Sequence, residues 1–565
     1  MKEKIVLKPT NTNYLFKFSI VTAVYNVAPY LSEAIDSILS QDIGFLESVE
    51  LILVDDGSTD ASGAICDEYQ HKYPENIVVI HKPNGGVASA RNAGIAVARG
   101  RYVNFMDSDD KLTPDTLSSV YDFFIEHDKE VDLVSVPIFY FEQKNEPHRL
   151  NYKYASDKAQ VIDLTTHYSY VQMSSASAFF KREALNDHTF DTSLRYAEDS
   201  KAIMELLLEN PQYGIVPQGR YLYRARTSMN SALNGSKSHR EWYIDCLKNY
   251  IFWALDEAKS RFGAIPDYVQ YNVMYDLQGR FKVDEIPETV LTPHEKTIFL
   301  KMLFDAVFQI DDHIILEQKN LSMELKDYIM SIKKAPDSGT LQFDDKSEDA
   351  WFQYPDLSTG HASSYQLRLT SMELMKHDIL LEGAAKIYLR FPYPANLFLR
   401  ITTGHTTHMV KCCFREDPEH VFRFNGQKLA VFLKFTAVIP YEMFSGITHI
   451  EFCWDCDGHT ICYHSLHRMS EFPLAYGQQK LLLNKKSYYA TLSSQMLTFE
   501  EATPVSKLKN HTHSVLRRIR KICYLKYHSK YFSYFPVFFV LQSFCQYGSI
   551  QLNRINLYAI CCYLK

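Results

Sequence analysis

The first part of the chain alternates short apolar runs with longer amphipathic stretches. The apolar runs predict strands over residues 18–25, 49–54, 77–80, 102–106 and 131–137, and the stretches between them predict helices over residues 30–41, 60–73, 87–98 and 114–126. This alternation is the pattern of βαβ units, in which a helix connects two parallel strands. Thr113-Pro114 carries the N-cap and N1-proline pattern of a helix start. We therefore predict an α/β domain with a mainly parallel sheet over residues 1–235.

Three further segments follow, each with a different pattern. Residues 236–335 are rich in helix formers and aromatic residues with apolar positions three or four apart, which predicts a helical region. Residues 335–349 are polar and contain Pro336, Gly339 and several acids, which is typical of a linker. Over residues 350–505, β-branched runs separated by turn residues favour a β-rich module with a sandwich-like antiparallel arrangement.

The tail, residues 506–565, is basic and then aromatic. Six Lys and Arg residues between 517 and 530 precede an uncharged stretch, Tyr531–Leu552, that is long enough to span a bilayer. Pro536, Gly548 and three glutamines make this stretch a poor spanning helix. We therefore expect a basic amphipathic segment that lies on an anionic membrane surface. A docked or disordered terminus is the alternative.

Composition narrows the class of protein. A chain of 565 residues exceeds one ordinary core, and a formal net charge of −7 gives no global reason to expect nucleic-acid binding. The 11 cysteines are scattered through this long chain, which predicts reduced thiols in a cytosol and no disulfide framework. Residues 1–13 are polar and lack the apolar core of a signal peptide. We expect a cytoplasmic protein that is peripheral at the inner face of the cell membrane.

Two acidic turns follow strand-like runs in the first predicted domain. Asp55-Asp56 comes after Leu51–Val54, and Asp107-Ser108-Asp109-Asp110 comes after Tyr102–Met106. In open α/β sheets ligands bind beyond the carboxyl ends of the strands, so the two turns can converge on one crevice. A hard divalent cation bridged to a diphosphate would relieve the repulsion among such carboxylates. Ordinary Asx turns or solvated turns are the alternative.

Two more charged positions extend this candidate site. Arg91 lies in the small-residue helix predicted after Asn84-Gly85-Gly86, where a charge needs a partner such as a diphosphate or the acidic turns. Glu198-Asp199 opens a helical pattern, where the helix dipole stabilises a carboxylate anion. An ionised carboxylate suits a general base, which takes the proton of a hydroxyl. A surface arginine after a tight turn and plain helix capping are the structural alternatives.

In combination, these segments resemble the family 2 glycosyltransferases, which are inverting, nucleotide-sugar-dependent enzymes of the GT-A fold. The resemblance covers about residues 17–235 and keeps the order of the family's motifs. Thr22 stands where the family often has proline. The matching segments are Ser19–Asn26, Val54–Asp60, Asn84–Asn92, Asp107–Asp110 and Glu198-Asp199.

The resemblance implies which residues bind the nucleotide-sugar. Asp55 and Asp56 are expected to contact the nucleoside, uridine in particular, and the backbone around Thr22 and Tyr25 is expected to flank it. Arg91 is expected near the diphosphate. Arg226 belongs to a segment, residues 223–228, that resembles the mobile segment closing over the donor phosphates in the family.

The resemblance also implies the catalytic and metal-binding residues. Asp107 and Asp109 match the D-x-D pair that holds Mn²⁺ or Mg²⁺, with Asp109 as the direct ligand and Asp107 also close to the nucleotide-sugar. Asp199 matches the catalytic base, and Glu198 is its neighbour in the donor site. One displacement with a base and no enzyme nucleophile predicts inversion at the anomeric carbon.

The later segments resemble bacterial teichoic-acid and capsule glycosyltransferases. The helical region after the catalytic domain, the β-rich module and the basic segment are similar to the arrangement that leads into a CDP-glycerol glycerophosphotransferase domain. We expect a truncated relative of such a fusion. The resemblance implies transfer of a hexose or N-acetylhexosamine from a UDP-sugar to a hydroxyl of a polysaccharide or polyol-phosphate polymer.

Two other functions compete with this one. A nucleotidyltransferase shares the α/β nucleotide domain and acidic metal ligands, but the first strand here is followed by Tyr25–Pro29, which is no glycine-rich activation loop. A non-catalytic polymer-binding protein would rely on the β-rich module. Asp107, Asp109 and Asp199 are all present, which argues against loss of activity.

A stretch rich in cysteine and histidine lies inside the β-rich module. Cys453 and Cys456 form one C-x-x-C, and His459, Cys462, His464 and His467 follow. A structural zinc site usually needs two well-spaced ligand pairs, whereas this single pair falls within a strand-like alternation. We therefore expect buried strand cysteines in preference to zinc.

Overall fold

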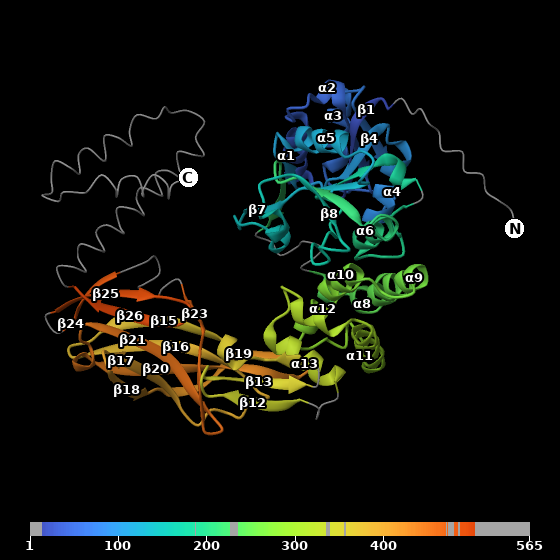
Figure 1. The fold of residues 1–565 in the computed structure, drawn as a ribbon. Helices are drawn as coiled ribbons and strands as arrows, with labels where there is room; N and C mark the ends of the chain where they lie inside the picture. The colour runs from blue at the N-terminus through green and yellow to red at the C-terminus, as the bar shows by residue number, and fades with distance from the viewer. Residues whose placement is uncertain are drawn as a thin grey trace, which may run out of the picture.

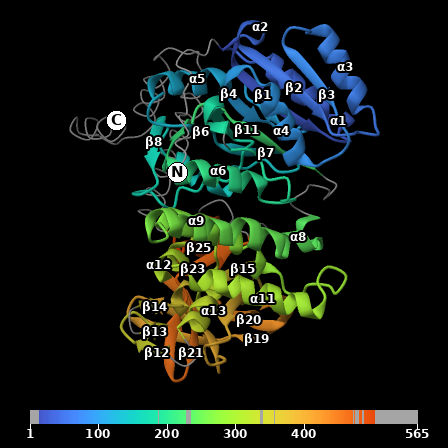
Figure 2. The same cartoon turned by 90° about the vertical axis from the view of Figure 1, so that its right-hand side faces the viewer.

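The computed structural model of the protein describes residues 14–186, 188–226, 235–334, 339–354, 357–469, 472, 479–483 and 486–502. An α/β domain, a layer of helices and a β-rich module follow one another along the described chain (Figures 1 and 2). The tail and the membrane contact expected of it lie outside these residues, and the exact domain boundaries stay predictions. Within the described ranges, no helix has both the length and the apolar character needed to cross a membrane.

The α/β domain is built on an eight-stranded sheet with the order β3-β2-β1-β4-β9-β6-β10-β8. The pairings among β1, β2, β3 and β4 and between β6 and β10 are parallel, whereas β9 is antiparallel to both its neighbours and β8 to β10. The predicted mainly parallel sheet is confirmed. Its strands are β1 (Phe16–Val24), β2 (Val49–Asp55), β3 (Ile77–His81), β4 (Gly100–Phe105), β6 (Leu133–Ser135), β8 (Gln160–Asp163), β9 (Ala178–Lys181) and β10 (Gln212–Ile215).

Helices cover both faces of this sheet, because its central strands are buried on both sides. In β1, Phe18 and Ile20 belong to one core cluster and Val21 to the other. The first cluster takes side chains from α1, α3 and α5, and the second from α4 and α6. The helices are α1 (Ala28–Leu39), α2 (Phe45–Ser48), α3 (Ser62–Lys72), α4 (Val87–Val97), α5 (Thr116–Glu126) and α6 (Glu198–Glu209).

The close packing of α4 on β1 depends on a glycine. A Cβ atom added at Gly94 would lie 2.3 Å from Cγ1 of Val21, far inside van der Waals contact. The small-residue character of this helix therefore has a structural reason, since a larger side chain would push α4 away from the sheet. The helix carries Arg91, so this packing also fixes where that charge lies.

The start of α5 differs from the prediction. The helix begins at Thr116 with Asp115 in the N-cap position, so Thr113-Pro114 does not open it. The Thr113 hydroxyl instead donates to the Asp115 carboxylate at 2.7 Å, and the Thr113 carbonyl accepts from the Gln41 side chain at 2.9 Å. These bonds hold the segment that follows β5 (Lys111–Leu112). Strand β5 forms a small second sheet with β11 (Tyr221–Ala225) and β7 (Ile138–Glu142).

The helical region continues the second core cluster, which runs without interruption from the α/β domain into the β-rich module. The Tyr268 hydroxyl donates to the Leu207 carbonyl at 3.1 Å, which ties α10 to α6. The helices are α8 (Arg240–Tyr243), α9 (Trp253–Phe262), α10 (Asp267–Leu277), α11 (Pro293–Phe308), α12 (Asp312–Glu317) and α13 (Met323–Lys333).

The β-rich module contains three sheets and is antiparallel except where β15 pairs with β23. A three-stranded sheet has the order β12 (Thr340–Asp344), β13 (Asp349–Tyr354) and β14 (Leu357–Thr359). The second has the order β19 (Cys413–Phe424), β20 (Gln427–Pro440), β16 (Asp378–Tyr388), β15 (Gln366–Leu374) and β23 (Ser465–Arg468). The third contains β18 (Thr406–Lys411), β17 (Leu397–Thr403), β21 (Ile447–Cys456), β26 (Leu497–Glu501), β25 (Lys486–Leu492), β24 (Gln479–Leu483) and β22 (His459–Cys462).

The linker prediction was wrong for its second half. Residues 340–344 form β12, which pairs with β13 in a hairpin, whereas residues 335–338 lie outside the described residues. The turn of this hairpin, residues 345–347, is exposed. Beside it, α13 buries two acids against the module: the Glu324 carboxylate binds Nζ of Lys386 at 2.8 Å, and the Asp327 carboxylate accepts from the Tyr365 hydroxyl at 3.0 Å.

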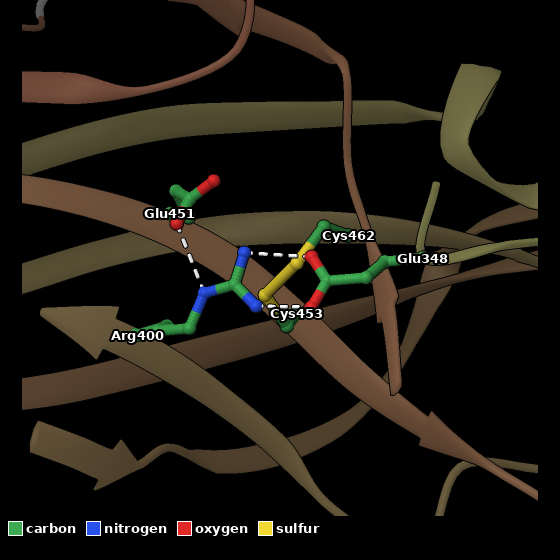
Figure 3. The surroundings of a disulfide bond; sticks show 5 residues. All are labelled: Glu348, Arg400, Glu451, Cys453 and Cys462. Carbon is green, nitrogen blue, oxygen red and sulfur yellow. Dashed lines mark hydrogen bonds and ion pairs between the residues drawn. A yellow bond between two sulfur atoms is a disulfide. The ribbon is translucent and has the colours of Figure 1, made fainter. Parts of the chain in front are cut away.

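The expectation of reduced cysteines was wrong at one pair, because Cys453 and Cys462 form a disulfide (Figure 3). The two residues face each other on the antiparallel strands β21 and β22, with their Cα atoms 4.2 Å apart. That spacing is typical of a non-hydrogen-bonded pair, whose side chains lie close together. Strand register creates this pairing, and register is not visible in the spacing of the cysteines. Arg400 lies nearby and binds Glu348 and Glu451.

Candidate active site

Asp55 lies at the carboxyl end of β2, where both of its carboxylate oxygens have hydrogen-bond partners. Its Oδ1 accepts the backbone N–H of Ser58 at 2.9 Å, and its Oδ2 lies 2.8 Å from Nδ1 of His81, the last residue of β3. Burial of Asp55 opposes ionisation, but the bonds from Ser58 and His81 outweigh it and lower the pKa of this carboxyl. Asp55 is therefore an ionised acceptor at the edge of the sheet.

Asp56 is turned into the loop that precedes α4. Its carboxylate accepts the backbone N–H of Gly85 at 3.0 Å and of Gly86 at 2.8 Å, and it forms an ion pair with Lys82. Gly86 has a φ of 84°, a left-handed conformation that glycine adopts without strain. Asp56 thus shapes the glycine turn before α4, and its expected contact with the nucleoside stays a prediction.

The end of β1 flanks these two acids. Thr22 is buried, and its hydroxyl has no hydrogen-bond partner among the described residues, whereas Tyr25 is 52% exposed. Asn26 has a φ of 49° and accepts the backbone N–H of Thr59 at 2.8 Å through its side chain. This bond ties the end of β1 to the loop after β2. The expected contact of the backbone around Thr22 and Tyr25 with the nucleoside stays a prediction.

Arg91 joins two of the predicted acidic elements. Its guanidinium donates to Oε1 of Glu198 at 2.8 Å and to Oδ1 of Asp107 at 3.2 Å. The Arg91 side chain is only 7% exposed, and the ring of Phe190 lies 5.2 Å below the guanidinium. Burial disfavours the cation, but Asp107, Glu198 and Asp199 more than compensate and raise the pKa of Arg91. The arginine predicted to need a partner therefore has the D-x-D turn and the α6 acids as its partners.

Glu198 and Asp199 open α6 after a strained residue. Ala197, in the N-cap position, has a φ of 65°, which costs a non-glycine residue free energy and often marks a functional site. Burial, together with the charge of Asp199, raises the pKa of Glu198 to about 7. Burial also raises the pKa of Asp199, although Arg91 and backbone N–H groups oppose it. A carboxylate with a raised pKa is a stronger base, which suits proton abstraction.

The acids of the D-x-D turn have separate partners. Asp109 binds the guanidinium of Arg226, with Nε 2.8 Å from Oδ2. Asp110 is buried and accepts the Tyr221 hydroxyl at 2.7 Å and the Arg224 backbone N–H at 2.7 Å. Burial, reinforced by the neighbouring Asp109 and Asp107, raises the pKa of Asp110. Asp110 therefore anchors β11 to the turn and brings Arg226 to the site.

Sequence patterns missed three residues that complete this arrangement: His81, Lys82 and Tyr221. His81 and Lys82 immediately follow a predicted strand, which is a positional signal for a site in an α/β sheet. Tyr221 had no such signal, because β11 is brought to the turn by tertiary packing. Arg224 lies in the segment 223–228 singled out in the sequence, and its side chain binds Glu33.

The oxygen ligands of Asp107 and Asp109 fit a hard divalent cation. Burial and the charges of Asp109 and Asp199 raise the pKa of Asp107, although Arg91 opposes this, so like charges are crowded at the turn. Mg²⁺ and related cations are commonly held by one or two carboxylates together with substrate phosphates, so two protein ligands suffice. The residues present therefore fit Mn²⁺ or Mg²⁺.

The other metal candidates do not form a comparable site. Cys453 and Cys462 are consumed in the disulfide, and Cys456 is buried. In the described part of the chain, one group of three has metal-ligand spacing, namely Asp417, Glu419 and His420. Two of its three members, Glu419 and His420, are exposed.

Comparison with known proteins agrees with the fold. Residues 19–189 match Glycosyl transferase family 2. The minor teichoic acid biosynthesis protein GgaA of Bacillus subtilis strain 168 is 31% identical over 322 residues, which are 56% of this chain and 72% of GgaA. GgaB of the same strain, a second minor teichoic acid biosynthesis protein, is 34% identical over 372 residues, 66% of this chain and 41% of GgaB. The chain thus spans less than half of GgaB.

The crystal structure of S. aureus TarS has a similar fold over most of this chain. Its TM-score is 0.55 with 16% sequence identity, over 87% of this chain and 86% of TarS. At this identity the likeness concerns the fold: a GT-A domain, a helical region and a β-rich module. The chain belongs to glycosyl transferase family 2.

Proposed function

We propose that this protein is a metal-dependent inverting glycosyltransferase that moves a hexose or N-acetylhexosamine from a UDP-sugar to a hydroxyl of a cell-surface polymer. The observation that carries the proposal is the Arg91 cluster, in which one buried guanidinium joins the D-x-D turn to the acids at the start of α6. A teichoic acid, or else a capsule polymer, is the proposed acceptor, since GgaA and GgaB are named for minor teichoic acid biosynthesis.

In this proposal Asp199 is the general base. It takes the proton of the acceptor hydroxyl, which attacks the anomeric carbon from the face opposite the nucleotide and so inverts its configuration. Glu198 holds Arg91 against Asp107, which keeps the base and the donor-binding turn in one fixed relation. Asp107 and Asp109 would hold the cation, which when bound supplies positive charge to the departing diphosphate.

The base assignment is tested with Asp199→Asn. We expect transfer from a UDP-sugar to be abolished while UDP binding, measured by calorimetry, changes little, because the asparagine keeps the shape but cannot take a proton. Asp191→Asn is the matched control. Asp191 forms an ion pair at 2.7 Å with Lys201, which lies on α6 like Asp199, and Asp191 has no proposed catalytic role. Near-normal turnover by Asp199→Asn would refute the assignment.

The metal site is tested with Asp109→Ala. We expect this variant to lose the increase in UDP affinity that Mn²⁺ or Mg²⁺ gives the wild type, because it removes the proposed direct ligand. Asp163→Asn is the control, because the Asp163 carboxylate accepts the backbone N–H of Thr165 in a turn and has no proposed role in metal binding. An unchanged metal dependence of UDP binding in Asp109→Ala would count against this ligand.

The donor sugar and the membrane contact need separate experiments. Thermal unfolding in the presence of Mn²⁺ and a panel of nucleotide-sugars identifies the donor, because a ligand that binds only the folded state raises the melting temperature. The proposed location is cytoplasmic, peripheral at the inner face of the membrane through residues 506–565. Removal of these residues should release the protein from membranes without changing turnover on a soluble acceptor, and unchanged membrane fractionation would contradict the anchor.

A further inference from the structure

The imidazole of His81 lies between two carboxylates. Its Nδ1 is 2.8 Å from Oδ2 of Asp55 at the end of β2, and its Nε2 is 2.9 Å from Oδ1 of Asp67 on α3. The His81 side chain is 49% exposed, so it stands at the rim of the sheet and not in the core. A neutral imidazole has one N–H donor, whereas an imidazolium has two, so only the protonated ring satisfies both carboxylates.

We propose that His81 is a positioning residue for nucleotide recognition, which holds Asp55 ionised and oriented so that this carboxylate accepts a hydrogen bond from the nucleoside. The inference rests on the proposed function and deepens it by naming how the nucleoside is selected. His81 itself acts through Asp55, on which the direct contact with the ligand depends.

The surroundings of Asp55 limit what it can recognise. Oδ1 already accepts from the Ser58 backbone N–H at 2.9 Å, and Oδ2 accepts from His81. A Cβ atom at Gly63 would lie 3.0 Å from Oδ2, so α3 packs closely against that side of the carboxylate. An ionised carboxylate only accepts hydrogen bonds. The ligand group that binds it must therefore be a donor, such as N3–H of uracil or a ribose hydroxyl, and an acceptor at that position is disfavoured.

The charges around His81 determine how the contact responds to pH. Asp55 on β2 and Asp67 on α3 face the ring, and the next residue, Lys82, is held in an ion pair by Asp56. The hydrogen bond with Asp67, and then that with Asp55, raise the pKa of His81 against the opposing effect of burial. Protonation is therefore favoured until the pH passes this raised pKa. Above it, the neutral ring keeps one N–H, which can donate to only one of the two carboxylates at a time. Asp55 therefore loses its charge-assisted hydrogen bond, and nucleotide affinity falls.

The experiment measures the dissociation constant of UDP by calorimetry for the full chain with Mn²⁺, between about pH 5.5 and pH 8.5, a range that brackets histidine titration. The variants are His81→Ala, Asp67→Asn and Asp55→Ala. His313→Gln is the matched control, because His313 pairs with Asp267 at 3.1 Å in the helical region. The phosphates of UDP titrate near pH ~6 as well, so each variant is compared with the wild type at the same pH.

We expect His81→Ala to bind UDP about 3–10-fold more weakly than the wild type at the acid end, less than a full charge-assisted bond because His81 acts on the ligand only through Asp55, and by a smaller factor at the alkaline end. Asp67→Asn should keep the acid-end affinity but lose it at a lower pH than the wild type, since His81 then has a single carboxylate partner. The midpoint is the pH at which half of this affinity difference is lost. A residue that only supports the fold would not change that pH. His313→Gln should behave as the wild type.

The outcomes separate this inference from the proposed function. If the wild type does not bind UDP, or Asp55→Ala binds it normally, the proposed function or its nucleoside contact is wrong and the inference falls with it. If the wild type binds UDP through Asp55 but His81→Ala has the same affinity at every pH, or Asp67→Asn leaves the midpoint unchanged, only the role of His81 is overturned.

Discussion

Replacing Arg91 with methionine should destabilise the α/β domain strongly. The guanidinium is 7% exposed and bonds to Glu198, which is 10% exposed, and to Asp107. Methionine keeps an unbranched apolar stem of similar length but removes the charge, so the Glu198 carboxylate stays buried without its cation. Breaking a buried ion pair by removing one partner costs about 3–5 kcal/mol, and that is the loss of unfolding free energy expected near neutral pH.

The loss should depend on pH with a definite sign. The pKa of Glu198 is about 7 in the folded protein, above its ordinary value, so its contribution to stability is present at low pH and disappears as the pH rises through 7. Without Arg91 this pKa rises further, and each additional unit costs about 1.4 kcal/mol at alkaline pH. The variant should therefore fall further behind the wild type at about pH 8 than at about pH 5.5.

Urea unfolding followed by circular dichroism at both pH values measures this difference. Arg101→Met is the matched control, because Arg101 forms a partly exposed pair with Asp128 at 2.7 Å and its loss should cost only about 0–1 kcal/mol. Equal stability losses in the two variants, or a loss in Arg91→Met that shrinks as the pH rises, would refute this account of the cluster.

Three further predictions concern other parts of the fold. Gly94→Ala should cost about 1–3 kcal/mol in unfolding free energy, because the added Cβ would collide with Val21. Gly235→Ala should cost little, because its Cβ would lie 4.0 Å from the nearest neighbouring atom. Equal melting temperatures of the two variants would contradict the close packing of α4. The pKa of Asp327 is raised to about 6 by burial, so the wild type should lose stability as the pH rises through 6, and Asp327→Asn should show a weaker pH dependence in the same urea titrations. The double variant Cys453→Ala/Cys462→Ala should unfold about 2–4 kcal/mol more easily without a change in UDP affinity, and mass spectrometry of the unreduced wild type should find the two cysteines linked; free thiols there would contradict the disulfide.

Local pattern predicted most of the α/β domain because the signals are local. The alternation of apolar runs and amphipathic stretches placed the strands and helices around Asp55 and Arg91, and the order of the motifs identified the family. Boundaries were less secure: Thr113-Pro114 looked like a helix start, yet α5 begins at Thr116, because side-chain bonds to Thr113 hold the preceding segment beside the small sheet.

The sequence by itself determined which residue types stand at the strand ends: carboxylates after β2 and β4, a glycine turn with an arginine, and acids at the head of a helix. Only the tertiary structure decided their partners. Arg91 and Glu198 are 107 positions apart, and the hydrogen bond between them exists because α4 and α6 pack on the same face of the sheet. His81 meets Asp55 through the parallel register of β2 and β3, and Cys453 meets Cys462 through the antiparallel register of β21 and β22. Periodicity is a property of neighbouring residues, whereas register and packing are fixed by the free energy of the whole core.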